Sequence, residues 1–356
     1  MTPSSPIEPT SRSHLSEPVV VRWGRFSRRL QRRTLIVAFI MMLLVTALLV
    51  FALTAGSGGI EPTSLLHALA PDATVSERLV FEWRASRALA AALFGACLAI
   101  GGTVFQTLTR NPLGSPDIIG LSAGSYAGVI IVIILGGSGF LPFAAGAVSG
   151  GIVAAAFVYL LAFQRGIHGF RLIVVGLALG AILRALTSWF SIKADLDAAL
   201  QAAIWDAGSL SGMTWPLLAL STVVAMTLMF TLPAAFRLLP LIELGDEAAS
   251  SLGVRVERSK LLLIFIGVGF TAVVTAATGP ISFIALASPQ IARRLCGGTA
   301  PANMLASGLV GAVLLSSADL IAQHLVPGVH LPVGGVTVVI GGLYLVWLIT
   351  REGKRT

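Results

Sequence analysis

Charged residues are scarce in this chain, and their scarcity excludes the ordinary soluble proteins. Asp, Glu, Lys and Arg make up 11% of the 356 residues, while hydrophobic residues make up 56%. A soluble domain usually carries about 25% charged residues. The chain therefore has too few polar side chains to cover a soluble surface, and its apolar content also excludes disorder over most of its length.

Cysteine is almost absent as well. Cys97 and Cys296 both lie in or beside apolar runs, and two such residues form neither a disulfide framework nor a metal-spaced cluster. The chain also lacks the Gly-x-x-x-x-Gly-Lys-Ser/Thr loop that cradles nucleotide phosphates. We therefore expect no catalytic residue, no metal site and no cofactor bound by this chain.

Long apolar runs are what the sequence does contain. A helical crossing of a bilayer uses about 20 apolar residues, and backbone polar groups in lipid must be satisfied within their own segment. We therefore predict an all-α integral membrane protein with about ten transmembrane helices. The predicted spans are residues 34–54, 86–106, 117–136, 140–163, 172–192, 215–235, 261–278, 281–292, 303–325 and 332–350.

The basic residues predict the orientation of these spans. With ten spans, 19 of the 24 Lys and Arg residues fall in segments on one side. Cytoplasmic loops carry an excess of Lys and Arg, so we predict that both termini are cytoplasmic. The net charge of +8 then needs no nucleic-acid partner. The expected organisation is a disordered basic tail at 1–33, a ten-helix membrane domain at 34–350 and a cytoplasmic tail at 351–356.

The longest predicted inner loop, residues 236–260, is amphipathic between Leu238 and Leu252. A short helix of this kind could offer a knob to a cytoplasmic partner, although a solvated connector is the alternative. Two further stretches are unusual. Residues 109–120 contain two prolines four residues apart, which predicts a rigid turn at the inner end of the bundle. Residues 279–294 read as a short, broken crossing of the kind that lines cavities.

Together these stretches resemble the iron–siderophore and vitamin B12 permease family of ABC importers. The resemblance rests on five stretches, which are Gln106 to Gly120 with its Arg-Asn-Pro-Leu-Gly-Ser-Pro-Asp core, Trp205-Asp-Ala-Gly-Ser-Leu210, Leu244-Gly-Asp-Glu-Ala-Ala249, Gly279 to Arg294, and Leu331-Pro-Val-Gly-Gly-Val-Thr337. It covers roughly residues 35 to 350, and within the family the chain looks most similar to ferric enterobactin permeases. It departs from the family pattern at Gln290, where a histidine is usual, and at Ser86, where a proline is usual.

The resemblance implies a multi-pass subunit of a bacterial inner-membrane importer for ferric siderophore. Its first partner would be a second permease subunit, which would be a paralogue rather than an identical copy. The others would be an extracytoplasmic binding protein, membrane lipid and two copies of a cytoplasmic ATPase subunit, which would hold any ATP and Mg²⁺. Vitamin B12, haem and other metal chelates are alternative substrates. An ion-coupled secondary transporter is a less favoured class, because such proteins usually bury carboxylates or histidines in their spans.

Site residues follow from the resemblance. It implies that the inner loop couples to the ATPase and that Asn111 and Leu113 form the cytoplasmic gate. It also implies that Arg84 and Arg87 dock the binding protein, although both could simply anchor a helix end at the membrane surface. Arg184 lies inside a predicted span and could line the path of an anionic chelate or form a structural contact. The implied coupling residues are Leu244, Gly245, Asp246, Glu247, Ala248, Leu252 and Gly253.

Overall fold

The structure is a computed structural model in which helices dominate. It describes residues 18–23, 26–54, 74–117, 120–163, 169–298, 303–326, 328–329 and 331–352. The helices within those ranges are α1 (Arg32–Thr54), α3 (Val75–Thr109), α4 (Leu121–Ile134), α5 (Phe140–Ala162), α6 (Gly169–Lys193), α7 (Leu196–Asp206), α8 (Trp215–Met229), α9 (Leu232–Glu243), α10 (Asp246–Ser251), α11 (Val256–Thr278), α12 (Ile284–Cys296), α13 (Met304–His324) and α14 (Val333–Glu352).

The expected disordered tail contains regular structure where it is described. Strand β1 (Pro18–Trp23) pairs with strand β2 (Phe26–Gln31) in an antiparallel hairpin directly before α1. Valines at 19–21 favour a strand, which the basic composition concealed. Residues 1–17 and 353–356 lie outside the described residues, as does the turn at 24–25.

Each of the ten predicted spans coincides with helical structure, but fewer helices are long enough to cross a membrane alone. Six described helices pass a test of length and apolarity, namely α1, α3, α5, α6, α11 and α13, and the pair α8 and α9, bent by 52°, would make a seventh. Helix α4 has 14 residues, which corresponds to about 21 Å against a hydrocarbon core of roughly 30 Å. The structure therefore supports a multi-pass helical membrane protein.

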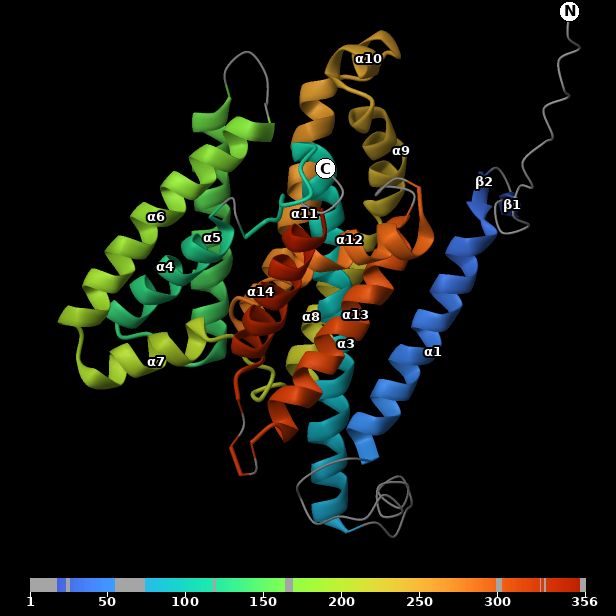
Figure 1. Ribbon diagram of the computed structural model, residues 1–356. Helices are drawn as coiled ribbons and strands as arrows, with labels where there is room; N and C mark the ends of the chain where they lie inside the picture. The colour runs from blue at the N-terminus through green and yellow to red at the C-terminus, as the bar shows by residue number, and fades with distance from the viewer. Residues whose placement is uncertain are drawn as a thin grey trace, which may run out of the picture.

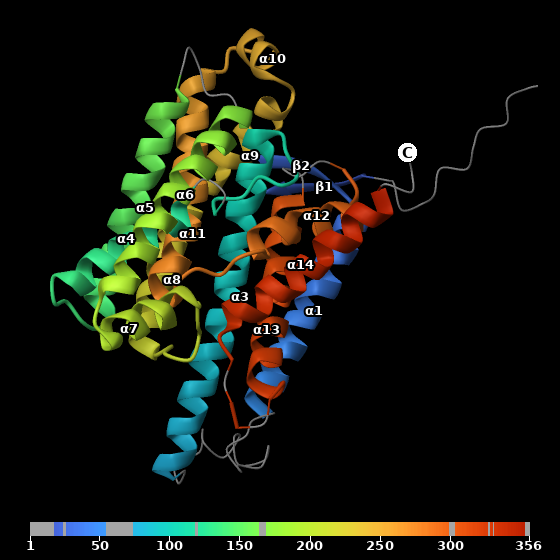
Figure 2. The same ribbon diagram turned by 60° about the vertical axis from the view of Figure 1, so that its left-hand side comes forward.

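Helix α3 is the centre of the bundle (Figure 1). Its side chains are largely buried, and it packs against α1, α11, α12 and α13. Small residues permit the closest approach, because a methyl group added at Gly95 would collide with the Gly311 carbonyl of α13. Helices α4 to α7 form a second group on the other side of α11, joined to it through α5. Figure 2 shows these two groups of helices from a second direction.

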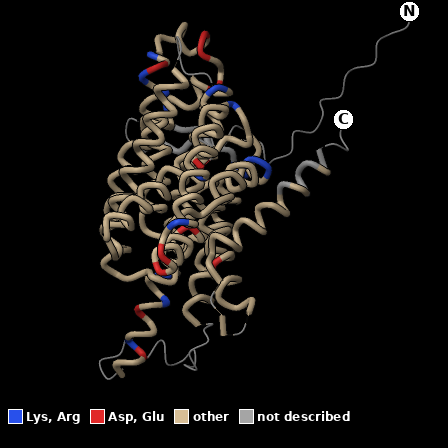
Figure 3. Tube along the Cα trace, turned by 90° about the vertical axis from the view of Figure 1, so that its left-hand side faces the viewer, with Lys and Arg blue, Asp and Glu red and all other residues tan. Residues whose placement is uncertain are grey.

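Charge is confined mainly to the ends of the bundle. In Figures 1 and 2, α10 lies at one end, and the start of α1 and the end of α14 lie toward that same end. Most of the tube between the two ends carries no charged residue (Figure 3). This arrangement agrees with a membrane-embedded middle between two polar ends.

Candidate functional site

The predicted inner loop folds into two helices rather than one. Helix α9 ends at Glu243, and α10 begins at Asp246, because Gly245 between them has φ of 115°. Backbone in this region is open to glycine and strained for other residues. Leu244 and Leu252 flank α10, and their side chains are 65% and 63% exposed. The two exposed leucines beside α10 therefore place apolar side chains at the end of the bundle.

The remaining predicted coupling residues occupy the same projection. Glu247 and Ala248 are exposed on α10, and Gly253 follows it with φ of 80°. Asp246 differs because its carboxylate is held from two sides. Lys260 on α11 donates to Oδ2 at 2.6 Å, and Arg110 at the end of α3 donates to Oδ1 at 2.6 Å. Neither Arg110 nor Lys260 was singled out from the sequence.

Two opposing influences act on the Asp246 carboxyl group. Partial burial on its own raises its pKa, while the hydrogen bond and charge of Lys260, followed by those of Arg110, lower it. The net result is a pKa below the ordinary value of the carboxyl group. Asp246 is therefore a charged anchor at the base of α10 at neutral pH.

The predicted rigid turn follows α3 directly. Arg110 ends α3 in the left-handed conformation with φ of 48°. The Asn111 side chain accepts a hydrogen bond from the Leu113 amide at 2.9 Å, and the Gly114 amide donates to the Asn111 carbonyl at 2.9 Å. Leu113 is 47% exposed. The two predicted gate residues thus lie in one compact turn, here termed the Asn111 turn (residues 111–114).

The Asn111 turn is tied to the second family-like stretch. Gln290 on α12 donates to the Pro112 carbonyl at 2.7 Å, and Gln106 on α3 donates to the Leu286 carbonyl at 2.8 Å. Gln290 occupies the position where the resembled family usually carries histidine. The contact with the Pro112 carbonyl requires only a hydrogen-bond donor, which the Gln290 amide supplies. Both glutamines lie in the quoted motifs, but their partners are 178 and 180 residues away, which spacing alone does not reveal.

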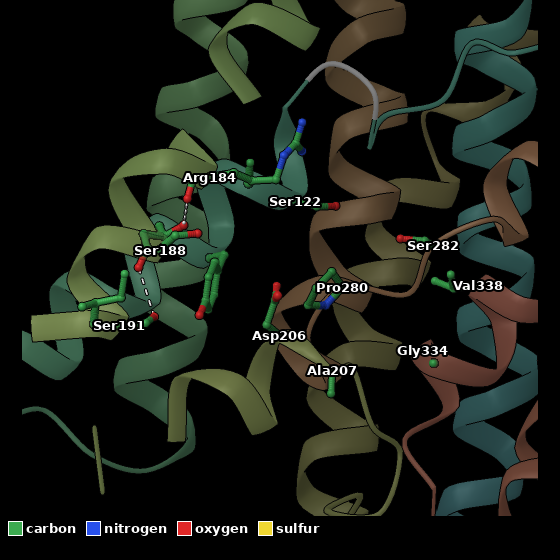
Figure 4. A pocket seen from close by; sticks show the side chains of 15 residues that line it. Ser122, Arg184, Ser188, Ser191, Asp206, Ala207, Pro280, Ser282, Gly334 and Val338 are labelled. Carbon is green, nitrogen blue, oxygen red and sulfur yellow. Dashed lines mark hydrogen bonds between the residues drawn. The ribbon is translucent and has the colours of Figure 1, made fainter. Parts of the chain in front are cut away.

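A cavity of about 690 Å³ lies between the α4–α7 group and the start of α14. Figure 4 shows its wall, with Arg184 and Asp206 on one side and Ser282 on the other. Pro280 and Ser282 belong to the non-helical residues before α12, so the short crossing lines a cavity, as predicted. Asp206 begins the Asp-Ala-Gly-Ser segment whose Gly208 carbonyl accepts from the Gly334 amide.

Arg184 is exposed and lies on α6 at the edge of this cavity. Its guanidinium nitrogens lie over Gly180, where an added methyl group would meet them at 3.6 Å. Tyr126 also lines the cavity, and its ring stacks on Trp205 with centroids 6.3 Å apart. The cavity therefore presents one cation, one carboxylate, several hydroxyl groups and the Tyr126 ring.

The two arginines predicted at the outer end have protein partners. Arg87 on α3 makes a buried ion pair with Asp319 on α13, with a closest approach of 2.8 Å and side chains 13% and 4% exposed. Arg84 is partly buried, and its Nη1 donates to the Leu53 carbonyl of α1 at 3.1 Å. Both lie in the first half of α3, and the start of this helix is at the end of the bundle opposite α10 (Figure 1).

Comparisons with known proteins agree on a single class. A family model described as the FecCD transport family matches residues 37–351. The ferric enterobactin transport system permease protein FepG of Escherichia coli K12 is 42% identical over 325 residues, which covers 91% of this chain and 98% of that protein. The hemin transport system permease protein HmuU of Yersinia pestis is 32% identical and covers 92% of this chain and 98% of that protein.

A solved structure shows the same fold. It is described as an inward-facing conformation of a metal-chelate type ABC transporter, and it superimposes with a TM-score of 0.78 at 27% identity. The match covers 89% of this chain and 99% of the solved chain. The family resemblance read from the motifs is thereby confirmed.

Proposed function

Because the chain belongs to the FecCD transport family, we propose that it carries a ferric siderophore of the enterobactin type across the bacterial inner membrane. The observation that supports this substrate most strongly is the 42% identity to a ferric enterobactin permease over nearly the whole of both chains. The chain is a permease subunit of an ABC transporter, not an enzyme, and works with a partner permease and an ATPase. No other named relative given above exceeds that identity.

The membrane domain at residues 34–350 is proposed to make ten crossings with both termini in the cytoplasm. The four crossings beyond the clear candidates would be α4, the bent pair α8 and α9, α12 and α14. Helices shorter than the bilayer can be accommodated where they are buried by neighbours or line an aqueous cavity. This topology is supported by the position of α10, because the start of α1 and the end of α14 lie toward the same end of the bundle (Figures 1 and 2).

The cytoplasmic end is proposed to dock the ATPase through α10 and its flanking residues. The exposed side chains of Leu244 and Leu252 supply the apolar contact, and Glu247 and Ala248 lie on the same projection. Asn111 and Leu113 in the Asn111 turn would form the cytoplasmic gate. ATP and Mg²⁺ would be bound by two copies of the partner ATPase, and this chain would hold no cofactor.

The substrate path is proposed to pass the cavity that Arg184 borders. A guanidinium group attracts an anionic chelate, and an arginine inside a membrane domain is stable only where it faces water or a protein interior. The second permease subunit, proposed to be a paralogue, would close the open side of this path. A binding protein would dock at the opposite end from α10, near Arg84 and Arg87. An arginine has five N–H donors on three guanidinium nitrogens. In Arg87, Nε and Nη2 already donate to Asp319 and Nη1 donates to Ser211.

A substrate panel tests the proposed function. Cells that lack this permease would be supplied with the chain and its partner subunits, and uptake would be measured for radiolabelled ferric enterobactin, a ferric hydroxamate, haemin and vitamin B12. We expect this chain to restore uptake of ferric enterobactin above the other three. Restoration of haemin or vitamin B12 uptake alone would assign a different substrate to the same permease.

A further inference from the structure

Arg110 joins three parts of the cytoplasmic end at one side chain. It terminates α3, and the Asn111 turn begins at the next residue. Its Nη2 donates to Asp246 Oδ1 at the start of α10 at 2.6 Å and to the carbonyl of Ile242 in α9 at 3.1 Å. The same guanidinium therefore binds both α9 and α10, the two helices that the break at Leu244 and Gly245 separates.

Contacts continue from this point toward the cavity. The Pro112 carbonyl in the Asn111 turn accepts from Gln290 on α12 at 2.7 Å. The residues directly before α12 include Pro280 and Ser282, which line the cavity. A contiguous chain of contacts thus leads from α10 through Asp246, Arg110 and the Asn111 turn to α12. Energetic coupling between distant sites can travel through such networks of packed and hydrogen-bonded groups.

We propose that Arg110 is a positioning residue that transmits movement of α10 to the Asn111 turn within one permease subunit. The proposal rests on the proposed function, in which α10 docks the ATPase and the turn forms the gate. Asp246 is the first residue of α10 and would move with this helix. Its ion pair with Arg110 would then transmit the movement to Asn111, the first residue of the turn. Lys260 binds the other oxygen of Asp246 and fixes the orientation of the carboxylate relative to α11.

The exposure of the pair separates this role from a structural one. The side chains of Arg110 and Asp246 are 45% and 38% exposed. An ion pair at that exposure contributes little to folding stability, because water and salt screen it. Loss of the Arg110 side chain should therefore leave the subunit folded and assembled, while the mechanical link between α10 and the turn is lost.

The test uses the complete importer in proteoliposomes, with radiolabelled ferric enterobactin as the probe. The variants are Arg110→Gln, Arg110→Lys and Asp246→Asn, and Arg293→Gln serves as a matched loss of one exposed charge at the same end. The measurements are ATPase co-purification, ATP hydrolysis and uptake per ATP hydrolysed. We expect Arg110→Gln to keep co-purification and hydrolysis but to lower uptake per ATP at least about tenfold, within the usual range of coupling between sites. Arg110→Lys should recover part of the loss.

The double variant Arg110→Gln with Asp246→Asn adds a second criterion. If both residues act through one link, its defect should equal that of the more severe single variant rather than the product of the two. Uptake per ATP equal to that of Arg293→Gln would overturn the proposal, and so would loss of ATPase co-purification in Arg110→Gln. Leu244→Glu tests the underlying assignment separately, because continued ATPase co-purification in that variant would reject α10 as the docking element whatever Arg110 does.

Discussion

The Arg87 guanidinium and the Asp319 carboxylate form a largely buried ion pair between α3 and α13, 232 positions apart in the sequence. Gln323 adds a donor to the same carboxylate at 2.7 Å. Any docking role of Arg87 would therefore be combined with its contact to Asp319 of the same subunit. The pair joins the first half of the central helix α3 to the last turns of α13.

Arg87→Ala is predicted to destabilise the subunit strongly. Removing one member of a buried ion pair leaves the other charge without compensation and costs about 3–5 kcal/mol. The melting temperature of the purified subunit in detergent measures the effect. The double variant Arg87→Met with Asp319→Leu should recover most of the loss, because apolar residues of similar volume often replace a buried pair at little cost. If the single variant melts like the wild type, the pair has no structural role.

The contribution of the Asp246 ion pairs to folding stability is predicted to be lost only in acid. The folded-state pKa of Asp246 is lowered, so its contribution is fully present above the unfolded value of about 3.9. That contribution is lost as the pH falls through the lower, folded value. The melting temperature of wild type minus that of Asp246→Asn should be small and positive near neutrality, since the carboxylate is 38% exposed. It should begin to fall below about pH 4 and approach zero only at a pH below the folded pKa. A difference that grows in acid would reverse the assigned direction.

Arg184→Ala is predicted to discriminate between substrates by charge. The guanidinium borders the proposed path, and its removal takes away attraction for an anion but not for a neutral molecule. Uptake of an anionic and of a neutral ferric chelate should be compared in this variant, with Arg184→Lys as the charge-preserving control. We expect uptake of the anionic chelate to fall several-fold more than uptake of the neutral one. Equal losses would remove the charge argument.

Gly95→Val is predicted to separate α3 from α13. The Cβ of any larger residue would overlap the Gly311 carbonyl and the backbone of Ala312, and a packed interior accommodates added volume only at a cost of about 1–3 kcal/mol or more. Gly342→Ala on α14 is the matched control, because nothing lies within 4 Å of its added Cβ. The melting temperatures of both variants check the prediction, and similar values would show that the close approach is not required.

Much of the fold follows from the sequence, because apolar runs must become helices in lipid. Residues 140–163 and 303–325 were predicted as spans and correspond closely to α5 and α13. Lengths were less predictable. Helix α3 extends to 35 residues, since its polar first turns, capped by Thr74 and Glu77, are helical beyond the apolar run. Helices α8 and α9 bend at residues 230–231, just before Pro233 in the first turn of α9, and the prediction of one span at 215–235 missed this signal of a helix start.

The site was predictable where motifs are local and hidden where contacts are distant. Leu244, Gly245 and Leu252 were identified through the family motif, but the break at Gly245 was not predicted, although a glycine between amphipathic segments favours one. The partners of Asp246 could not be predicted, since Arg110 is 136 residues away. Likewise, Asp319 was visible as a charge within a span, but its pairing with Arg87 depends on how α3 and α13 pack. Tertiary contacts of this kind carry no periodic pattern in one sequence.

ATP-dependent import in proteoliposomes tests the central claim most directly. The complete importer would be reconstituted with radiolabelled ferric enterobactin and binding protein on one side and ATP on the ATPase side. The account predicts that label accumulates only when ATP and the ATPase are both present, and that a pH or sodium gradient does not replace them. Accumulation driven by an ion gradient without ATP would contradict the account and identify a secondary transporter.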